Sequence, residues 1–249
     1  MNDQRLGDVV AHTRTLLLDF DGPIYSICSG LPAPEAAAGL LHILGGTGTS
    51  PSQLPLRSET DPLEVLRASA VMPGDVAAAV SEALQEAEER AARSASPTPY
   101  ADDMLLAARD SGRRLGVVSN NSVAAMREYL DRADLKDMFD RITGRYDGMG
   151  PELMKPSGHL VTMTMTGMDA APWNPTLVGD STTDVQVANA VGIRCIGYAN
   201  LLGFRLRFVA AVTTGAARRN TRMMPNGVLR WSFPDGVLWV IWLRDHCRL

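Results

Sequence analysis

Short apolar runs alternate with segments of helical spacing through the second half of the chain. Residues 115–119, 139–143, 176–180 and 194–198 are predicted to be short strands, most of which are brief apolar runs next to turn residues. Helical patterns precede or separate them at residues 101–111, 123–133, 156–166 and 185–191. This alternation predicts an α/β fold with a parallel sheet covered by helices on both faces. Residues 15–19 form one more apolar run, which we expect to be the first strand.

The segment after that first strand breaks the alternation. Between residues 25 and 100 the sequence has helical spacing only, at residues 31–44, 61–70 and 74–93, followed by a linker rich in Pro and Ser. We expect this segment to be a helical cap over the carboxyl edge of the sheet. The predicted organisation is a core of residues 1–24 and 101–204, a cap of residues 25–100, and a tail of residues 205–249.

The tail differs from the rest of the chain in composition and pattern. It has eight arginines against Asp235 and Asp245, has no lysine, and holds three of the four tryptophans, Trp231, Trp239 and Trp242. Its apolar residues follow neither the period of a strand nor that of a helix, so we expect it to pack poorly or to fold outside the sheet. Sequence divergence, an added partner-binding element and a frame shift in the gene all remain open.

Composition excludes several classes of protein. A net charge of -4 over 249 residues gives no reason to expect binding to nucleic acid or to an anionic membrane. Cys28, Cys195 and Cys247 show no metal-binding spacing, so reduced thiols are expected. Charged residues interrupt the N-terminal region, and the apolar run at residues 237–243 is too short to span a bilayer. We therefore expect a cytoplasmic protein; its oligomeric state is not indicated.

Candidate chemistry lies where the predicted strands end. Asp19 and Asp21 follow the first strand, and Asp180 and Asp184 follow the strand at residues 176–180. Open parallel sheets bind ligands at the carboxyl ends of their strands, so these four carboxylates are expected to converge. Such a cluster needs protons or a cation to be stable. Mg²⁺ is the expected cation, since it is held by a few carboxylates together with substrate phosphate. The sequence thus predicts a phosphate-handling enzyme.

Two further positions fit that interpretation. Ser119 and Asn120 end a predicted strand just before a helix, where a hydroxyl and main-chain N–H groups can hold a phosphate; taken alone, a plain helix cap is the better explanation. Lys155 precedes Pro156 before another helix. Lys136 and Lys155 are the only lysines, which makes a lysine at this position notable, although a surface lysine is the plain alternative.

In these motifs the chain resembles the haloacid dehalogenase-like hydrolase superfamily, in the branch that carries a helical cap between the first and second motifs, as in phosphoglycolate phosphatases and β-phosphoglucomutases. The resemblance implies a Rossmann-like core in which Asp19 is the nucleophile and Asp21 the general acid and base. It further implies that Ser119, Asn120 and Lys155 hold the phosphoryl group. The implied metal site consists of Asp19, Asp21, Asp180 and Asp184.

The expected function is a Mg²⁺-dependent phosphatase acting on a small phosphorylated metabolite through an aspartyl-phosphate. A phosphomutase acting on a sugar phosphate and a catalytically inert binding protein are the alternatives. Asp21 argues against the metal-free dehalogenases of the family, and the absence of lysine from residues 25–100 argues against its phosphonate-cleaving branch. Substrate choice is expected to rest on cap side chains such as Arg57 or Arg67.

Overall fold

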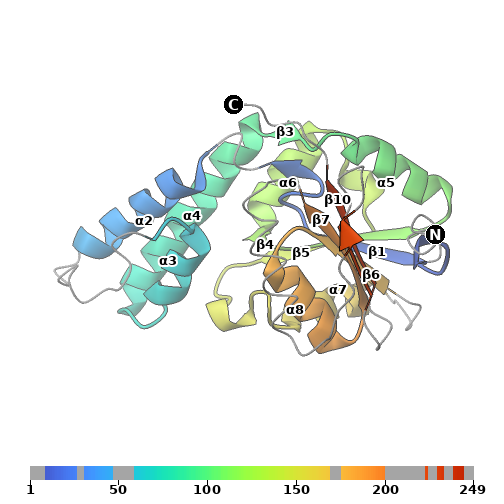
Figure 1. The fold of residues 1–249 in the computed structure, drawn as a ribbon. Helices are drawn as coiled ribbons and strands as arrows, with labels where there is room; N and C mark the ends of the chain where they lie inside the picture. Colours follow the sequence, from blue (N-terminus) through green and yellow to red (C-terminus); the bar gives the residue numbers. More distant parts are fainter. Residues whose placement is uncertain are drawn as a thin grey trace.

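A computed structural model of the chain describes residues 9–26, 31–46, 59–168 and 175–199, together with three short segments at 222–223, 229–232 and 238–243 (Figure 1). A central sheet with helices packed around it makes up one part of the molecule, and a group of three helices lies beside it. No helix in these ranges is long and apolar enough to cross a membrane.

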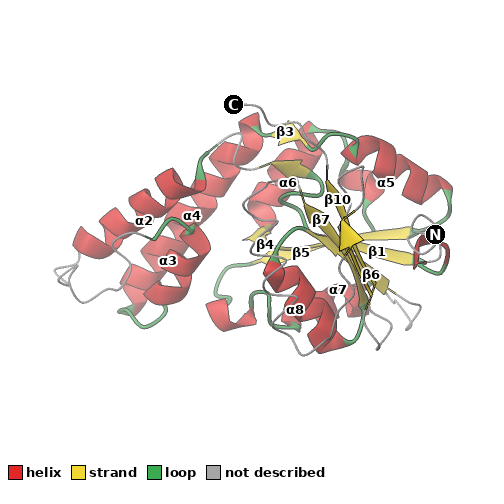
Figure 2. Ribbon diagram, in the orientation of Figure 1, coloured by secondary structure: helices red, strands yellow, loops and turns green. Residues whose placement is uncertain are grey.

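Five parallel strands run from one edge of the sheet in the order β5-β4-β1-β6-β7 (Figure 2). They are β1 (Thr15–Leu18), β4 (Arg114–Ser122), β5 (Arg141–Arg145), β6 (Pro175–Gly179) and β7 (Arg194–Ala199). The first strand is central, and Leu18 at its end lies beside Val117 of β4 and Val178 of β6. The predicted α/β fold with a parallel sheet is confirmed.

The alternation of side chains along β1 explains the two layers of helices. Leu16 and Leu18 belong to a buried cluster with α5 (Ala101–Asp110) and α6 (Val123–Arg132). Leu17, which points to the other face, belongs to a second cluster with α7 (His159–Gly167) and α8 (Thr182–Val191). Both faces of the sheet are therefore apolar, which is why its strands appear as continuous apolar runs in the sequence.

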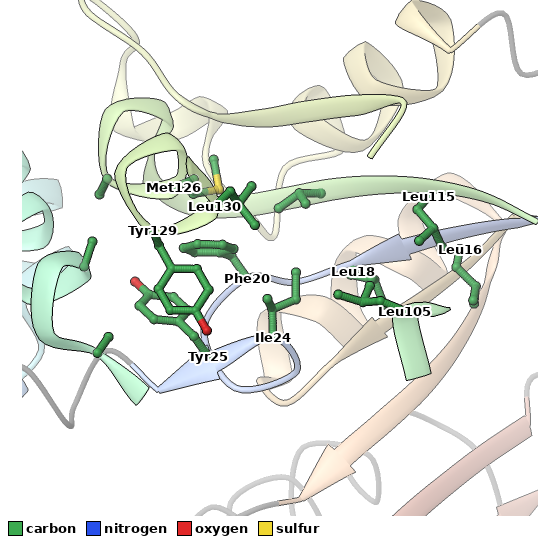
Figure 3. Packing of buried hydrophobic residues seen from close by; sticks show 14 of the residues in the cluster. Leu16, Leu18, Phe20, Ile24, Tyr25, Leu105, Leu115, Met126, Tyr129 and Leu130 are labelled. Carbon is green, nitrogen blue, oxygen red and sulfur yellow. The ribbon is translucent and has the colours of Figure 1, made fainter. Parts of the chain in front are cut away.

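An aromatic cluster fixes the chain just after β1. The rings of Phe20, Tyr25 and Tyr129 are fully or almost fully buried, and their centroids are 4.2 Å (Phe20–Tyr25), 5.6 Å (Phe20–Tyr129) and 4.6 Å (Tyr25–Tyr129) apart (Figure 3). Ile24 is buried in the same cluster. The segment that follows Asp19 is thus held against α6 by large apolar side chains.

The three remaining helices form a separate bundle. They are α2 (Ala33–Gly46), α3 (Pro62–Ser69) and α4 (Gly74–Ser94), and they share a buried cluster that includes Leu40, Val65 and Leu84. The two chain segments that connect this bundle to the sheet pair with each other as β2 (Tyr25–Ser26) and β3 (Ser96–Pro97). The sequence predicts the helices but not this pair, because two-residue strands carry no periodic signal.

Some element boundaries differ from the sequence prediction. The strand expected at residues 139–143 is β5, which begins at Arg141, after the 3-10 helix η3 (Lys136–Met138). The helix expected from residue 156 begins at His159, beyond the 3-10 helix η4 (Pro151–Leu153). The later start of β5 is explained by Asp140. Its carboxylate accepts the N–H of Leu115 at 2.9 Å and takes the place of a main-chain partner at that point of β4.

Three strands of the tail extend the sheet. The strand β10 (Leu238–Leu243) pairs in parallel with β7, β9 (Leu229–Ser232) pairs antiparallel with β10, and β8 (Arg222–Met223) pairs antiparallel with β9. The prediction that the tail folds outside the sheet is wrong for these strands. The main-chain N–H and C=O groups along the outer edge of β7 can pair with a further strand. A continuous apolar run such as that of β10 can form a strand even though its residues do not alternate between apolar and polar. The other tail residues lie outside the described residues.

Candidate active site

Three neighbouring strands bring polar side chains to one edge of the sheet. Because Leu18 lies beside Val117 and Val178, the residues that follow these three positions emerge together at the carboxyl ends of β1, β4 and β6. The main-chain N–H of Asp19 donates to the carbonyl of Val178 at 2.8 Å. Carboxylate oxygens of Asp19, Asp180 and Asp184 all lie within 4.8 Å of one another. The convergence expected from the sequence is therefore present for these three residues.

Asp19 and Asp21 flank a residue of the aromatic cluster. Phe20 points into that cluster, and its N–H donates to Oδ1 of Asp19 at 2.8 Å. The Asp19 carboxylate lies instead with those of Asp180 and Asp184. Asp21 lies close enough to Asp180 to contribute to raising the pKa of that carboxyl. All four predicted aspartates thus belong to one electrostatic neighbourhood.

Gly22 allows the chain to turn tightly over this cluster. It has a φ of +95°, which residues with a side chain rarely adopt. A Cβ atom at this position would lie 2.2 Å from Oδ2 of Asp180. The hydroxyl of Thr98, next to β3, donates to the carbonyl of Gly22 at 2.6 Å, so the base of the helical bundle contacts the same turn. Glycine is therefore required here by both conformation and space.

Asp184 is fixed by the first turn of α8. Its Oδ2 accepts from the N–H and the hydroxyl of Ser181 at 3.0 and 2.6 Å, while the Ser181 hydroxyl accepts the N–H of Asp184, which completes a capping box. The remaining oxygen, Oδ1, accepts from Nζ of Lys155 at 2.5 Å. The carboxylate is completely buried, and its hydrogen bonds to Ser181 leave Oδ1 directed toward Lys155.

Lys155 lies at the centre of the cluster with only 1% of its surface exposed. Its Nζ is 2.9 Å from Oδ1 of Asp19, 2.5 Å from Oδ1 of Asp184, and donates to the carbonyl of Val118 at 3.2 Å. Burial alone would lower the pKa of Lys155, but the Asp184 and Asp19 carboxylates outweigh it and raise that pKa above its usual value. The ammonium is therefore a permanent positive charge next to Asp19.

The carboxylates are crowded in spite of this lysine. Burial, followed by the charge of Asp184, raises the pKa of Asp19 to about 7, although Lys155 and Ser119 act in the opposite direction. Burial and the charges of Asp19, Asp184 and Asp21 raise the pKa of Asp180 well above its ordinary value. The raised pKa values mean that the cluster carries more negative charge than Lys155 neutralises when all of its carboxylates are ionised. Carboxylate oxygens are the ligands that a hard divalent cation prefers, so the cluster suits such a cation.

The end of β4 contributes Ser119 and Asn120. The Ser119 hydroxyl donates to Oδ1 of Asn121 at 2.9 Å, and it lies close enough to Asp19 to lower the pKa of that carboxyl. The side chain of Asn120 instead contacts the main chain of Lys155: Oδ1 accepts its N–H at 2.7 Å, and Nδ2 donates to its carbonyl at 3.2 Å. Both polar atoms of the Asn120 side chain are thus engaged with the main chain of Lys155. The helix cap itself is Ser122, whose hydroxyl accepts the N–H of Ala125.

Two residues at this edge were not predicted from the sequence. Arg145, at the end of β5, is 5% exposed and donates to the carbonyl of Asn120 at 2.7 Å. It also forms a buried ion pair with Glu88 of α4 at 2.9 Å. Neither residue stands in a local pattern that differs from those of surface arginines and glutamates, so no sequence signal could have identified them.

The helical bundle reaches the site through one of the two arginines proposed to govern substrate choice. Nη2 of Arg67 in α3 donates to the carbonyl of Lys155 at 3.0 Å, and Arg67 also pairs with Glu64. Arg57 lies outside the described residues. Lys136, the second lysine, is a surface residue that pairs with Asp131 at 3.1 Å. Of the two lysines, only Lys155 lies in the site.

Comparisons with known proteins identify the family of the chain. The profile of haloacid dehalogenase-like hydrolases matches residues 49–198, a range that contains Ser119, Lys155, Asp180 and Asp184 but begins after Asp19. A phosphoglycolate phosphatase of Pseudomonas putida is 30% identical over 99 residues, which are 40% of this chain and 35% of that protein. The chain thus matches only about a third of the length of that curated relative.

Solved structures show the same fold. A haloacid dehalogenase-like family protein from Bacteroides fragilis superimposes with a TM-score of 0.62 at 20% identity, covering 80% of this chain and 93% of that one. CbbY from Rhodobacter sphaeroides, in complex with phosphate, superimposes with a TM-score of 0.56 at 18% identity, covering 76% and 87%. At these identities the similarity establishes the fold.

Proposed function

The chain belongs to the haloacid dehalogenase-like hydrolase family, and we propose that it is a Mg²⁺-dependent phosphatase that acts on a small phosphorylated metabolite through an aspartyl-phosphate. One observation carries the proposal. Asp19 is a buried carboxylate 2.9 Å from a lysine ammonium, at the carboxyl edge of a parallel sheet, with two more carboxylates within 4.8 Å. A phosphorylated substrate supplies the anionic group that the ammonium can hold, while the carboxylate supplies the nucleophile.

In the first step, an oxygen of the Asp19 carboxylate attacks phosphorus and the ester P–O bond breaks on the opposite side. Lys155 offsets the repulsion between the anionic nucleophile and the anionic phosphoryl group, and its buried position makes that interaction strong. The Ser119 hydroxyl and the main chain at Asn120 lie at the adjacent strand end, where they would hold the phosphoryl oxygens.

Asp21 is the proton carrier in this proposal. As the acid, it donates a proton to the departing alkoxide. As the carboxylate, it then takes a proton from the water that attacks the aspartyl-phosphate, and cleavage of the acyl-phosphate P–O bond restores Asp19. The position of Asp21 supports this role, since it is partly exposed where Asp19 is buried and therefore lies nearer to the leaving group and to solvent.

Asp19 and Asp180, with the main-chain carbonyl of Asp21, would hold the Mg²⁺, and Asp184 would support the metal site. The chemistry that Mg²⁺ supplies when bound is neutralisation of these carboxylates and of the charge on the phosphoryl oxygens. The raised pKa values of Asp19 and Asp180 support the assignment, because a site that holds protons tightly at these oxygens also gains most from a cation there.

The proposed substrate is small because the helical bundle reaches the site. Arg67 of α3 donates to the carbonyl of Lys155, so the bundle contacts the segment that carries the proposed phosphoryl-binding ammonium. Residues 25–100 would then act as a cap. A phosphoglycolate phosphatase is among the relatives, and a variant of CbbY from Rhodobacter sphaeroides has been solved with xylulose-1,5-bisphosphate. Substrates of this size support the same class here.

Hydrolysis of p-nitrophenyl phosphate with Mg²⁺ and with EDTA tests the proposal. We expect turnover only with the metal, and loss of turnover in Asp19→Asn, while Asp110→Asn at the exposed end of α5 keeps the parental rate. Retention of more than about a tenth of the rate in Asp19→Asn would indicate another nucleophile, since tenfold corresponds to only ~1.4 kcal/mol of barrier. No turnover of any phosphate ester would favour the inert binding protein. Transfer of phosphate to a sugar hydroxyl, followed by ³¹P NMR, would identify a mutase.

A further inference from the structure

The side chain of Asn120 forms a two-point clamp on the residue that carries the catalytic ammonium. It accepts the N–H of Lys155 at 2.7 Å and donates to the carbonyl of the same residue at 3.2 Å. Both groups belong to the main chain, so Asn120 pairs with Lys155 much as a neighbouring strand would. With these two bonds, both polar atoms of the buried Asn120 amide are used on one residue 35 positions away.

Asn120 is itself held by a buried ion pair. Nη1 of Arg145 donates to the carbonyl of Asn120 at 2.7 Å, and both terminal nitrogens of Arg145 contact the Glu88 carboxylate, at 3.1 and 2.9 Å. The second oxygen of Glu88 also accepts the N–H of Ser122 at 2.9 Å. Arg145 and Glu88 are each 5% exposed. A buried pair of this kind is costly to desolvate, and it persists where further hydrogen bonds satisfy both partners.

The contacts form a continuous path from α4 to the reacting centre. Glu88 holds Arg145, Arg145 holds Asn120, Asn120 holds the main chain of Lys155, and Nζ of Lys155 lies 2.9 Å from Asp19. In the contacts that define this path, Asn120, Arg145 and Glu88 meet no reacting atom. Lysine has four side-chain torsions, so the placement of Nζ to within ~0.5 Å depends on a fixed main chain at its base.

We infer that Asn120 is a positioning residue that sets the location of the Lys155 ammonium through the Lys155 main chain, and that the Glu88–Arg145 pair keeps Asn120 in place. This inference rests on the proposed function, since it takes Lys155 as the group that meets the phosphoryl oxygens. The inferred role of the Asn120 amide is to hold Lys155, not to bind phosphate. The inference also gives a function to the Glu88–Arg145 ion pair, which joins the helical bundle to the sheet.

The lysine content of the chain allows a direct test. Because Lys136 and Lys155 are the only lysines, Lys136→Arg on the surface leaves a protein whose single lysine is Lys155. In that background, lysine labelled with ¹³C at Cε gives one NMR signal that reports on the ammonium site, without any substrate or metal. We expect Asn120→Ala to move this signal toward the position of free lysine.

A matched control separates positioning from loss of stability. Leu130→Ala removes a buried side chain of α6 that makes none of the contacts in this path, and it should destabilise the fold without moving the Lys155 signal. Glu88→Gln provides a second variant if Asn120→Ala does not fold, and it leaves Lys155 as the single lysine. It keeps the shape of the side chain but removes the charge that pairs with Arg145, so a smaller shift in the same direction is expected.

Turnover of p-nitrophenyl phosphate completes the experiment. We expect kcat to fall by about 10- to 100-fold in Asn120→Ala, because a misplacement of about 1 Å costs up to ~10²-fold, while Leu130→Ala keeps kcat within about twofold. An unchanged Lys155 signal would overturn the inference. This includes the case in which Asn120→Ala raises only KM and the inhibition constant of inorganic phosphate, as loss of a phosphate ligand would. A shifted signal with unchanged kcat would overturn it as well. An inactive parent protein would refute the proposed function, while the NMR comparison would still decide whether Asn120 positions Lys155.

Discussion

Replacement of the proposed nucleophile should make the metal-free protein more stable at neutral and alkaline pH. Burial and the neighbouring Asp184 raise the pKa of Asp19 to about 7 from an ordinary value of 3.8. A carboxylate whose pKa is higher in the folded state favours folding while it is protonated. That contribution is fully present below about pH 4 and is lost as the pH rises to about 7. Asp19→Asn keeps the shape of the side chain and removes the charge.

The magnitude follows from the two pKa values. About three pH units between them correspond to about 4 kcal/mol of unfolding free energy by pH 8. Asn also lacks the proton of the neutral acid and presents an amide near Nζ of Lys155, which offsets part of the gain. We therefore expect Asp19→Asn to be more stable than the parent by about 1–4 kcal/mol at pH 8 in EDTA, with little difference near pH 4.

Urea unfolding followed by far-UV circular dichroism at pH 4.5, 6 and 8 measures this difference. Asp110→Asn serves as the control for loss of one negative charge at an exposed position. Addition of Mg²⁺ should narrow the gap at pH 8, because a ligand that binds only the folded parent stabilises it by mass action. A variant that is less stable than the parent at pH 8, or a gap that does not change with pH, would refute the reasoning.

Three other substitutions have distinct expected outcomes. Lys155→Met should abolish turnover. It should also lower the free energy of unfolding by about 3–5 kcal/mol, whereas the change at Asp19 raises it, because Asp184 is left as a buried charge without its cation. Urea unfolding at pH 8 measures the sign of this change. Gly22→Ala should weaken Mg²⁺ binding and lower turnover at least tenfold, because the added Cβ would lie 2.2 Å from Oδ2 of Asp180. Titration of activity with Mg²⁺ measures the affinity, and an affinity equal to that of the parent would contradict the prediction. Asp21→Asn should reduce turnover by ~10²–10⁴ with sugar phosphates and less with p-nitrophenyl phosphate, whose leaving group needs no proton; equal losses would indicate a metal-binding or folding role.

The fold and the carboxylate cluster could be predicted because their signals are local. Short apolar runs identified most of the five parallel strands, and the residue types at or near the ends of three of them identified Asp19, Ser119 and Asp180. Carboxyl ends of parallel strands share one edge, so these residues could be placed together without coordinates. The prediction for the tail was wrong where it forms β8, β9 and β10, because the absence of alternation does not exclude a strand.

The sequence by itself determined the α/β architecture, the helical insertion and the charged groups at the sheet edge, since each follows from a repeating pattern or from a residue type directly after a strand. Only the tertiary structure decided how those groups are held. Asn120 meets Lys155 across 35 residues, and Arg145 meets Glu88 across 57, and neither separation follows any helical or strand period. Contacts of this kind depend on how α4, β4 and β5 pack against one another. A hydrogen bond acts over about 3 Å, whereas a sequence pattern fixes only which face of its own element a side chain occupies.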